Sequence, residues 1–191
     1  MIRNFFSFVF ELIKIIVIAL AIVIPVRYFL VQPFYVKGAS MEPTFYDSEY
    51  LIIDELSYRL RAPERGEVVV FRYPRDPSEF FIKRVIGLPG ETLEIIDGGV
   101  IIYNEANPEG KTLEEDYLPS DLKTYGFSDN EKVTLKEGEY YVMGDNRGSS
   151  KDSRTFGPVD ESFIVGRVIF RGWPFDRIDL FNELPEYSVG N

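Results

Sequence analysis

Short apolar runs separated by turn residues fill most of this sequence, and they constrain its fold more than any other feature. From residue 32 onward the runs are rich in β-branched residues, and Gly, Pro or Asp interrupts them. This pattern is typical of β-strands joined by tight turns. The runs cover residues 50–53, 67–71, 80–86, 93–96, 100–103, 139–143 and 164–170. We expect a mainly β fold of antiparallel sheets, as a partly open barrel or a sandwich-like core.

Two local features refine this expectation. Asp97-Gly98-Gly99 lies between two apolar runs and predicts a β-hairpin turn, whereas residues 54–60 allow one helical turn. Residues 91–139 hold 13 acids against 4 bases, which is most of the net charge of −10. We interpret residues 104–138 as a small inserted acidic subdomain between core strands, with a solvated surface.

The N-terminal segment has a different character. Residues 15–26 are uncharged and apolar, and the stretch reaches nineteen residues, 12–30, if Lys14 and Arg27 extend toward opposite interfaces. A cleavable signal peptide and a buried core helix are the alternatives. We favour a retained anchor with one transmembrane helix in residues 1–32, followed by a β-rich domain in residues 33–191. Arg3 and Lys14 weakly favour a cytoplasmic N-terminus, which would place the second domain outside the cytoplasm.

The chain contains no histidine and no cysteine. These absences exclude a Ser-His-Asp triad, a thiolate nucleophile, a disulfide framework and the common zinc motifs. An enzyme of this composition must move protons with a carboxylate, a lysine or a tyrosine. The net negative charge argues against a nucleic-acid partner.

Three segments could carry chemistry. The first, at 38–44, places Ser40 in a potentially exposed loop, although an ordinary loop is the alternative. In the second, at 81–91, apolar neighbours of Lys83 would lower the pKa of its amine, unless this cation only extends from a sheet edge. The third, at 144–154, is a dense polar loop that is either a hydrogen-bonded network or a solvated turn.

Together these segments resemble bacterial type I signal peptidases, the membrane-bound serine proteases that remove signal peptides from exported proteins. The matching stretches are SMEPT at 40–44, RGEVVVF at 65–71, FIKRVIGLPGE at 81–91 and GDNRGSSKDSR at 144–154. They occur in the order typical of the family, and the likeness runs from the anchor to residue 170.

The resemblance implies a Ser–Lys dyad, with Ser40 as the nucleophile and Lys83 as the general base. It also implies that Ser150 orients the Lys83 amine. Two bracing ion pairs are expected, Asp152 with Arg154 and Asp145 with Arg84. Some relatives carry a hydroxyl residue at the position of Gly38, so here the Ser40 N–H becomes the main oxyanion donor.

The resemblance further implies a substrate bound as an added strand, with small residues at the first and third positions before the cut. The residues expected to line the pockets are Phe34, Val36, Met41, Phe45, Leu51, Phe81 and Ile82, and Gly38 is expected to lie beside the bound substrate. We expect a monomer in the plasma membrane that needs no cofactor or metal and acts on preproteins next to the lipid bilayer. The alternatives are a relative dedicated to one secretion or pilus substrate, and an inactive membrane-anchored binding module.

Overall fold

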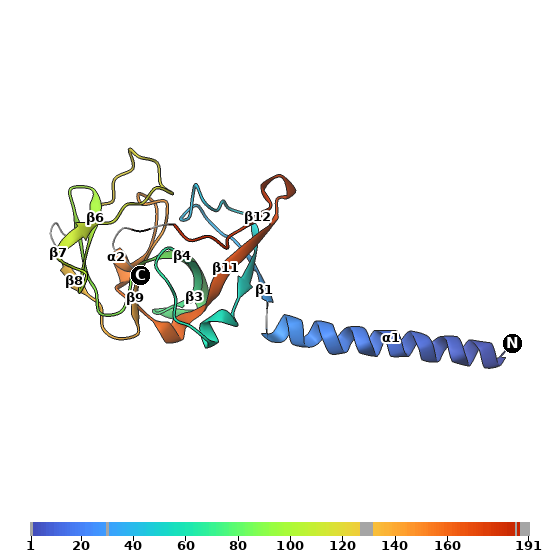
Figure 1. Ribbon diagram of the computed structural model, residues 1–191. Helices are drawn as coiled ribbons and strands as arrows, with labels where there is room; N and C mark the ends of the chain where they lie inside the picture. Colours follow the sequence, from blue (N-terminus) through green and yellow to red (C-terminus); the bar gives the residue numbers. More distant parts are fainter. Residues whose placement is uncertain (1, 30, 127–131, 186, 188–191) are drawn as a thin grey trace.

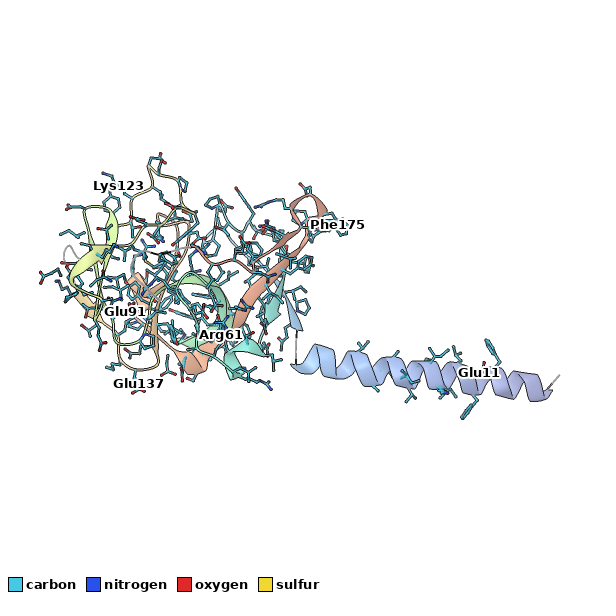
Figure 2. All side chains as sticks on the ribbon, viewed as in Figure 1. Glu11, Arg61, Glu91, Lys123, Glu137 and Phe175 are labelled. Atoms are coloured by element: carbon cyan, nitrogen blue, oxygen red, sulfur yellow. The ribbon has the colours of Figure 1, made fainter. Side chains whose placement is uncertain are left out.

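A long helix followed by a β-sheet body makes up the computed structural model of the chain (Figure 1). The structure describes residues 2–29, 31–126, 132–185 and 187. Helix α1 (Ile2–Phe29) extends away from the body, and its described side chains are exposed except for half-buried Val9 (Figure 2). Within the described part of the chain, no helix is both long and apolar enough to cross a membrane. The transmembrane helix therefore stays a prediction.

The body contains two sheets, and every pairing between their described strands is antiparallel. The larger sheet follows the order β1-β2-β11-β3-β4-β9-β10, and β12 pairs with β11. Its strands are β1 (Val31–Tyr35), β2 (Tyr50–Asp54), β3 (Val68–Tyr73), β4 (Asp76–Gly87), β9 (Glu139–Met143), β10 (Val159–Asp160), β11 (Ile164–Trp173) and β12 (Asp179–Leu180). The prediction of mainly antiparallel β structure is confirmed.

The smaller sheet has the order β7-β6-β5-β8 and lies on the side of the body away from α1 (Figure 1). Its strands are β5 (Thr92–Ile96), β6 (Gly99–Asn104), β7 (Asn107–Thr112) and β8 (Lys132–Thr134). Asp97 and Gly98, both with positive φ, form the two-residue turn between β5 and β6, as predicted. This sheet therefore combines strands from within the acidic stretch 104–138 with two strands that precede it.

Neither sheet closes into a barrel. Strands β1 and β10 lie at opposite ends of the larger sheet, and no pairing among the described strands joins them. Closure would require the two end strands to exchange backbone hydrogen bonds. The barrel form of the prediction thus reduces to an open sheet.

Short helical turns connect the strands. They are η1 (Ser57–Arg59), α2 (Ser153–Phe156), η2 (Glu161–Phe163) and η3 (Phe175–Arg177). The first of these is the single helical turn expected within residues 54–60. The Asp152 side chain caps α2 by accepting a hydrogen bond from the Arg154 N–H, which fixes the chain direction where the polar loop 144–154 ends.

Three apolar clusters support the sheets. One fills the space where the smaller sheet packs on β9, and it includes Ile86, Leu93, Ile102 and Met143. A second lies under the loop that follows β1, and the third lies around β3, β4 and β9. Because β9 pairs with β4, the loop after β9 begins next to the middle of β4. The order of the strands therefore brings three segments that are distant in sequence to one place.

Candidate active site

Ser40 lies in the loop between β1 and β2, and local hydrogen bonds shape this loop. Gly38 has φ +84°, a conformation that L side chains rarely adopt, and its N–H donates to Asp47 Oδ1 at 2.6 Å. The Glu42 N–H donates to the Ala39 carbonyl, which closes a turn around the serine. Ser40 is half-buried at the second position of this turn. The loop therefore presents a hydroxyl on a constrained backbone.

Lys83 lies on β4 directly opposite this hydroxyl. Its Nζ is 2.8 Å from Ser40 Oγ and donates a second hydrogen bond to the Ile82 carbonyl at 2.7 Å. The residue is 3% exposed. Burial lowers the pKa of the Lys83 amine to about 8, although the charges of Asp152 and Asp145 oppose the shift. A lysine with this pKa is partly neutral near pH 7 and can accept a proton from an adjacent hydroxyl.

The loop 144–154 completes the site, because the Arg84–Met143 pairing places its first residues beside Lys83. A Cβ added at Gly144 would clash with the Ser40 carbonyl and the Ser150 side chain, so only glycine allows these two segments to approach so closely. Asn146 donates from its backbone to the Ser40 carbonyl at 3.1 Å and from its side chain to the Ala39 carbonyl at 3.0 Å. These contacts join the serine loop to the polar loop.

Both predicted ion pairs are present and buried. Arg84 binds Asp145 through Nε and Nη2 at 2.9 and 2.6 Å. Arg154 binds Asp152 through the same two atoms at 2.9 and 2.7 Å. Burial alone would raise the pKa of Asp152, but the hydrogen bond and charge of Arg154 outweigh it and lower that pKa. The Asp152 carboxylate therefore stays ionised, and both carboxylates hold their arginines through paired, charge-assisted hydrogen bonds.

Ser150 departs from its expected contact. Its hydroxyl is buried and makes no hydrogen bond to any described residue, so the expected bond from Ser150 to Lys83 is not formed. In the free enzyme Lys83 donates to Ser40 and to the Ile82 carbonyl. The Ser150 hydroxyl lies instead against Gly144.

A cavity of about 590 Å³ adjoins the Ser40–Lys83 pair. Five of the predicted pocket residues line it: Phe34, Val36, Leu51, Phe81 and Ile82. Its walls also include residues that we did not predict as lining: Tyr35, Lys37, Val70, Ser78, Glu79, Phe80 and Lys151. Strand alternation and loop packing bring these residues to the cavity wall. The sequence alone does not give the position of β1 relative to β4, which decides which side chains face the cavity.

Two predicted lining residues lie elsewhere. Met41 and Phe45 are buried in the cluster beneath the serine loop, where they pack against Leu51 and Ile53. Gly38 contributes to the backbone of the loop and not to the cavity wall. The prediction that Met41 and Phe45 line the pocket is wrong, because an apolar side chain in a short loop is buried more effectively below the loop than beside it.

Other polar contacts in the site were not predicted individually. Thr44 Oγ1 donates to Asp145 Oδ2 at 2.6 Å, and Asn146 contacts Ala39 and Ser40 as described. Arg147 is fully buried and lies within the polar loop. The density of polar residues in this loop was the available signal, but it did not indicate which side chains face inward.

Comparisons with known proteins find one matching family and several similar chains. The family described as "Signal peptidase, peptidase S26" matches residues 9–173. The chain is 38% identical to "Probable signal peptidase I-2" of Synechocystis over 91% of this chain and 77% of that protein. It is 37% identical to "Signal peptidase IB" of Staphylococcus aureus strain MRSA252 over 90% of this chain and 92% of that protein. A solved signal peptidase I from Enterococcus faecalis V583 is 32% identical, with a TM-score of 0.45, and the match covers 56% of this chain and 97% of that one.

Proposed function

This chain belongs to the signal peptidase family, peptidase S26, and we propose that Ser40 and Lys83 are the dyad with which it cuts. The family makes it a serine protease that removes signal peptides from preproteins. The assignment of the dyad rests on the 2.8 Å contact between Lys83 Nζ and Ser40 Oγ. A histidine-free chain needs another base of suitable pKa, and buried Lys83 meets that need.

In the proposed acylation step, neutral Lys83 removes the proton from Ser40 Oγ as this oxygen attacks the scissile carbonyl carbon. A C–O bond forms and gives a tetrahedral oxyanion. When that intermediate collapses, the C–N bond breaks and the Lys83 ammonium passes its proton to the leaving amine. The products of this step are the acyl-enzyme on Ser40 and the free N-terminus of the mature protein.

In the proposed deacylation step, Lys83 activates a water molecule and Ser40 is the leaving group. Lys83, neutral again, takes a proton from water, and the resulting hydroxide attacks the ester carbon. The proton then returns to Ser40 Oγ as the C–O bond of the ester breaks. During this step Ser40 Oγ is an ester oxygen, so it no longer accepts the hydrogen bond from Lys83 Nζ as it does in the free enzyme. Ser150 carries a buried hydroxyl without a partner, and we assign it the role of holding the Lys83 amine at that stage.

The oxyanion needs donors that are in place before the reaction. Gly38 offers no hydroxyl, and its own N–H is used by Asp47. The Ser40 N–H has no acceptor among the described residues, which leaves it available to the developing negative charge. We assign it as the main oxyanion donor.

The substrate would bind as a strand between β1 and the first half of β4. Strand β1 is an edge strand that pairs only with β2 in the described part of the chain, and β9 pairs with β4 only from Arg84 onward. Both segments line the 590 Å³ cavity, and the ring centroids of Phe34 and Phe80, which both belong to its wall, lie 5.5 Å apart. Their free backbone groups suit an extended peptide, and the apolar walls suit small side chains.

We also propose that residues 1–32 anchor the enzyme in the plasma membrane. The apolar stretch of residues 12–30 and the exposed side chains of α1 support this assignment. The N-terminus would then lie in the cytoplasm and the catalytic domain, residues 33–191, outside it, as a monomer. Accessibility of a C-terminal tag from outside intact cells tests this topology, and an inaccessible tag contradicts it.

Cleavage of a preprotein by purified full-length protein in detergent tests the dyad. We expect Ser40→Ala and Lys83→Met each to lower kcat/KM by more than roughly 10³-fold, because each removes a group that acts in the bond-breaking steps. Ser162→Ala and Lys136→Met are matched controls, since both residues are exposed and lie outside the site. These controls should cleave like the unmodified chain.

The same assay separates the alternatives. A chain that is inactive on every preprotein while properly folded would indicate a binding module. Cleavage of one preprotein among many would indicate a dedicated relative. If Lys83→Met cleaves as fast as Lys136→Met, the proposed base is wrong.

A further inference from the structure

A segment of the acidic insert reaches across to the polar loop of the site. Residues 113–125, here called the strap, connect β7 to the residues that precede β8. The strap is tied to the smaller sheet at both ends. The Leu113 N–H donates to the Val100 carbonyl at 2.7 Å, and the Thr124 N–H donates to the Gly98 carbonyl at 2.9 Å. Its middle is therefore held at a fixed distance from the sheet.

Three side chains of the strap converge on one buried cation, Arg147. Its Nη1 donates to Glu115 Oε2 at 2.7 Å and to Thr124 Oγ1 at 2.6 Å. Its Nη2 binds Glu115 Oε1 and donates to the Tyr117 hydroxyl at 3.2 Å. The Arg147 side chain is fully buried, and that of Glu115 is 11% exposed. A guanidinium at this depth requires a carboxylate partner.

Arg147 in turn holds the backbone that faces Ser40. Its Nε donates to the Gly144 carbonyl at 3.1 Å, and its own carbonyl accepts from Arg154 Nη1 at 2.8 Å. Gly144 is the residue that touches both Ser40 and Ser150, and Asn146 bonds to the Ser40 carbonyl. A continuous set of contacts thus leads from Glu115 through Arg147 and Gly144 to the nucleophile.

A second contact supports the same arrangement. The Arg84 guanidinium lies over the Tyr117 ring, with Cζ 4.0 Å from the ring centroid, so the strap also covers the Arg84–Asp145 pair. In addition, Arg154 Nη1 donates to the Tyr125 carbonyl at 3.1 Å. Both bracing arginines of the site therefore contact the strap.

We propose that the strap is a positioning element for catalysis and that Glu115 and Thr124, acting through Arg147, set the position of the polar loop against Ser40. This inference rests on the proposed function of Ser40. It assigns a role to part of the acidic insert, whose other acids on the strap, Glu114, Asp116 and Asp121, are exposed. Solubility alone would explain exposed acids, but it does not explain a carboxylate that shares two hydrogen bonds with a buried arginine.

Steady-state kinetics of the full chain in detergent, with one signal-peptide-bearing substrate, tests the proposal. We expect Glu115→Ala to lower kcat by about 10- to 100-fold, because a shift of roughly 1 Å in a catalytic group has an effect of this size. KM should change by less than about twofold, since the substrate groove between β1 and β4 lies apart from the strap. Glu114→Ala, which removes the exposed neighbouring carboxylate, should match the unmodified chain.

Thr124 provides a subtler pair of variants if Glu115→Ala does not fold. Thr124→Val keeps the shape and removes only the hydroxyl that Arg147 binds, and it should lower kcat by a factor of about three to ten. Thr124→Ser restores the hydroxyl and should restore kcat. A purely structural role would lower the melting temperature of both variants without this pattern of loss and rescue.

Two outcomes would overturn the proposal. One is a kcat for Glu115→Ala equal to that of Glu114→Ala. The other is additive losses when Glu115→Ala is combined with Arg147→Met, because a single shared contact predicts that the double variant loses no more than Arg147→Met alone. If the unmodified chain cleaves and Ser40→Ala also cleaves, the proposed function fails instead, so the two failures are distinguishable.

Discussion

Burial makes Lys83 suited to the role of general base that we propose for it. An exposed lysine amine is almost entirely protonated at neutral pH. Here the surroundings remove water from the amine and lower its pKa to about 8, while Ser40 Oγ and the Ile82 carbonyl accept its hydrogen bonds. The negative charges of Asp152 and Asp145 keep the pKa of Lys83 from falling further. The result is a group that can exchange a proton with Ser40 under physiological conditions.

The pH dependence of kcat/KM should report this lysine. Lys83 must be neutral to act, so below its pKa of about 8 the rate should fall about tenfold per pH unit, and above that pKa it should level off. Cleavage rates at subsaturating substrate between pH 5 and about pH 10 measure this profile. Circular dichroism over the same range controls for unfolding, and an optimum on the acidic side would contradict a lysine base.

At the scale of elements, the pairing of β4 with β9 determines where the polar loop lies. Gly144 immediately follows β9, and the close contact of its backbone with Ser40 and Ser150 leaves no space for a side chain. Four residues later, Gly148 has open space around the position of a Cβ. The two glycines of one loop therefore have opposite tolerance to the same substitution.

Gly144→Ala should move the polar loop 144–154 away from the loop that carries Ser40. The added methyl group would clash with the Ser40 carbonyl, and moving the loop by about 1 Å should lower kcat by roughly 100-fold or more. Gly148→Ala is the matched control and should keep both kcat and thermal stability. Equal kinetics for the two variants would show that the close contact at Gly144 is unimportant.

At the scale of the whole molecule, one buried ion pair ties the smaller sheet to the larger one. Arg65, just before β3, donates to Glu91 through both terminal nitrogens at 2.9 and 2.6 Å and to the Ile86 carbonyl at 2.6 Å. Glu91, just before β5, also accepts from Asn104 at the end of β6. The side chain of Arg65 is fully buried, and that of Glu91 is 8% exposed.

Arg65→Met should therefore destabilise the fold strongly. Removing one partner leaves the Glu91 carboxylate buried without its cation, which costs about 3–5 kcal/mol of unfolding free energy. Urea unfolding followed by fluorescence measures the change. Lys136→Met removes an exposed pair with Glu139, whose N–O distance is 3.7 Å, and should have little effect. A similar small effect for both variants would contradict a structural role for the buried pair.

The sequence by itself determined the β class, the hairpin at Asp97-Gly98 and the two residues proposed for the dyad. These features are local or belong to short motifs, because strand propensity, turn chemistry and residue type are written in adjacent positions. The four motifs also predicted both ion pairs of the site. The match to the signal peptidase family agrees with the resemblance carried by the four motifs.

Only the tertiary structure decided which side chains face the cavity, the free hydroxyl of Ser150 and the contact of the strap with Arg147. Met41 and Phe45 are apolar in the sequence and so were equally suited to a pocket or to a core, and packing under the loop decided for the core. Glu115 is one acid among many in the insert until the fold places it beside a buried guanidinium. Contacts between residues far apart in the chain depend on strand order and register, and local sequence does not encode these directly.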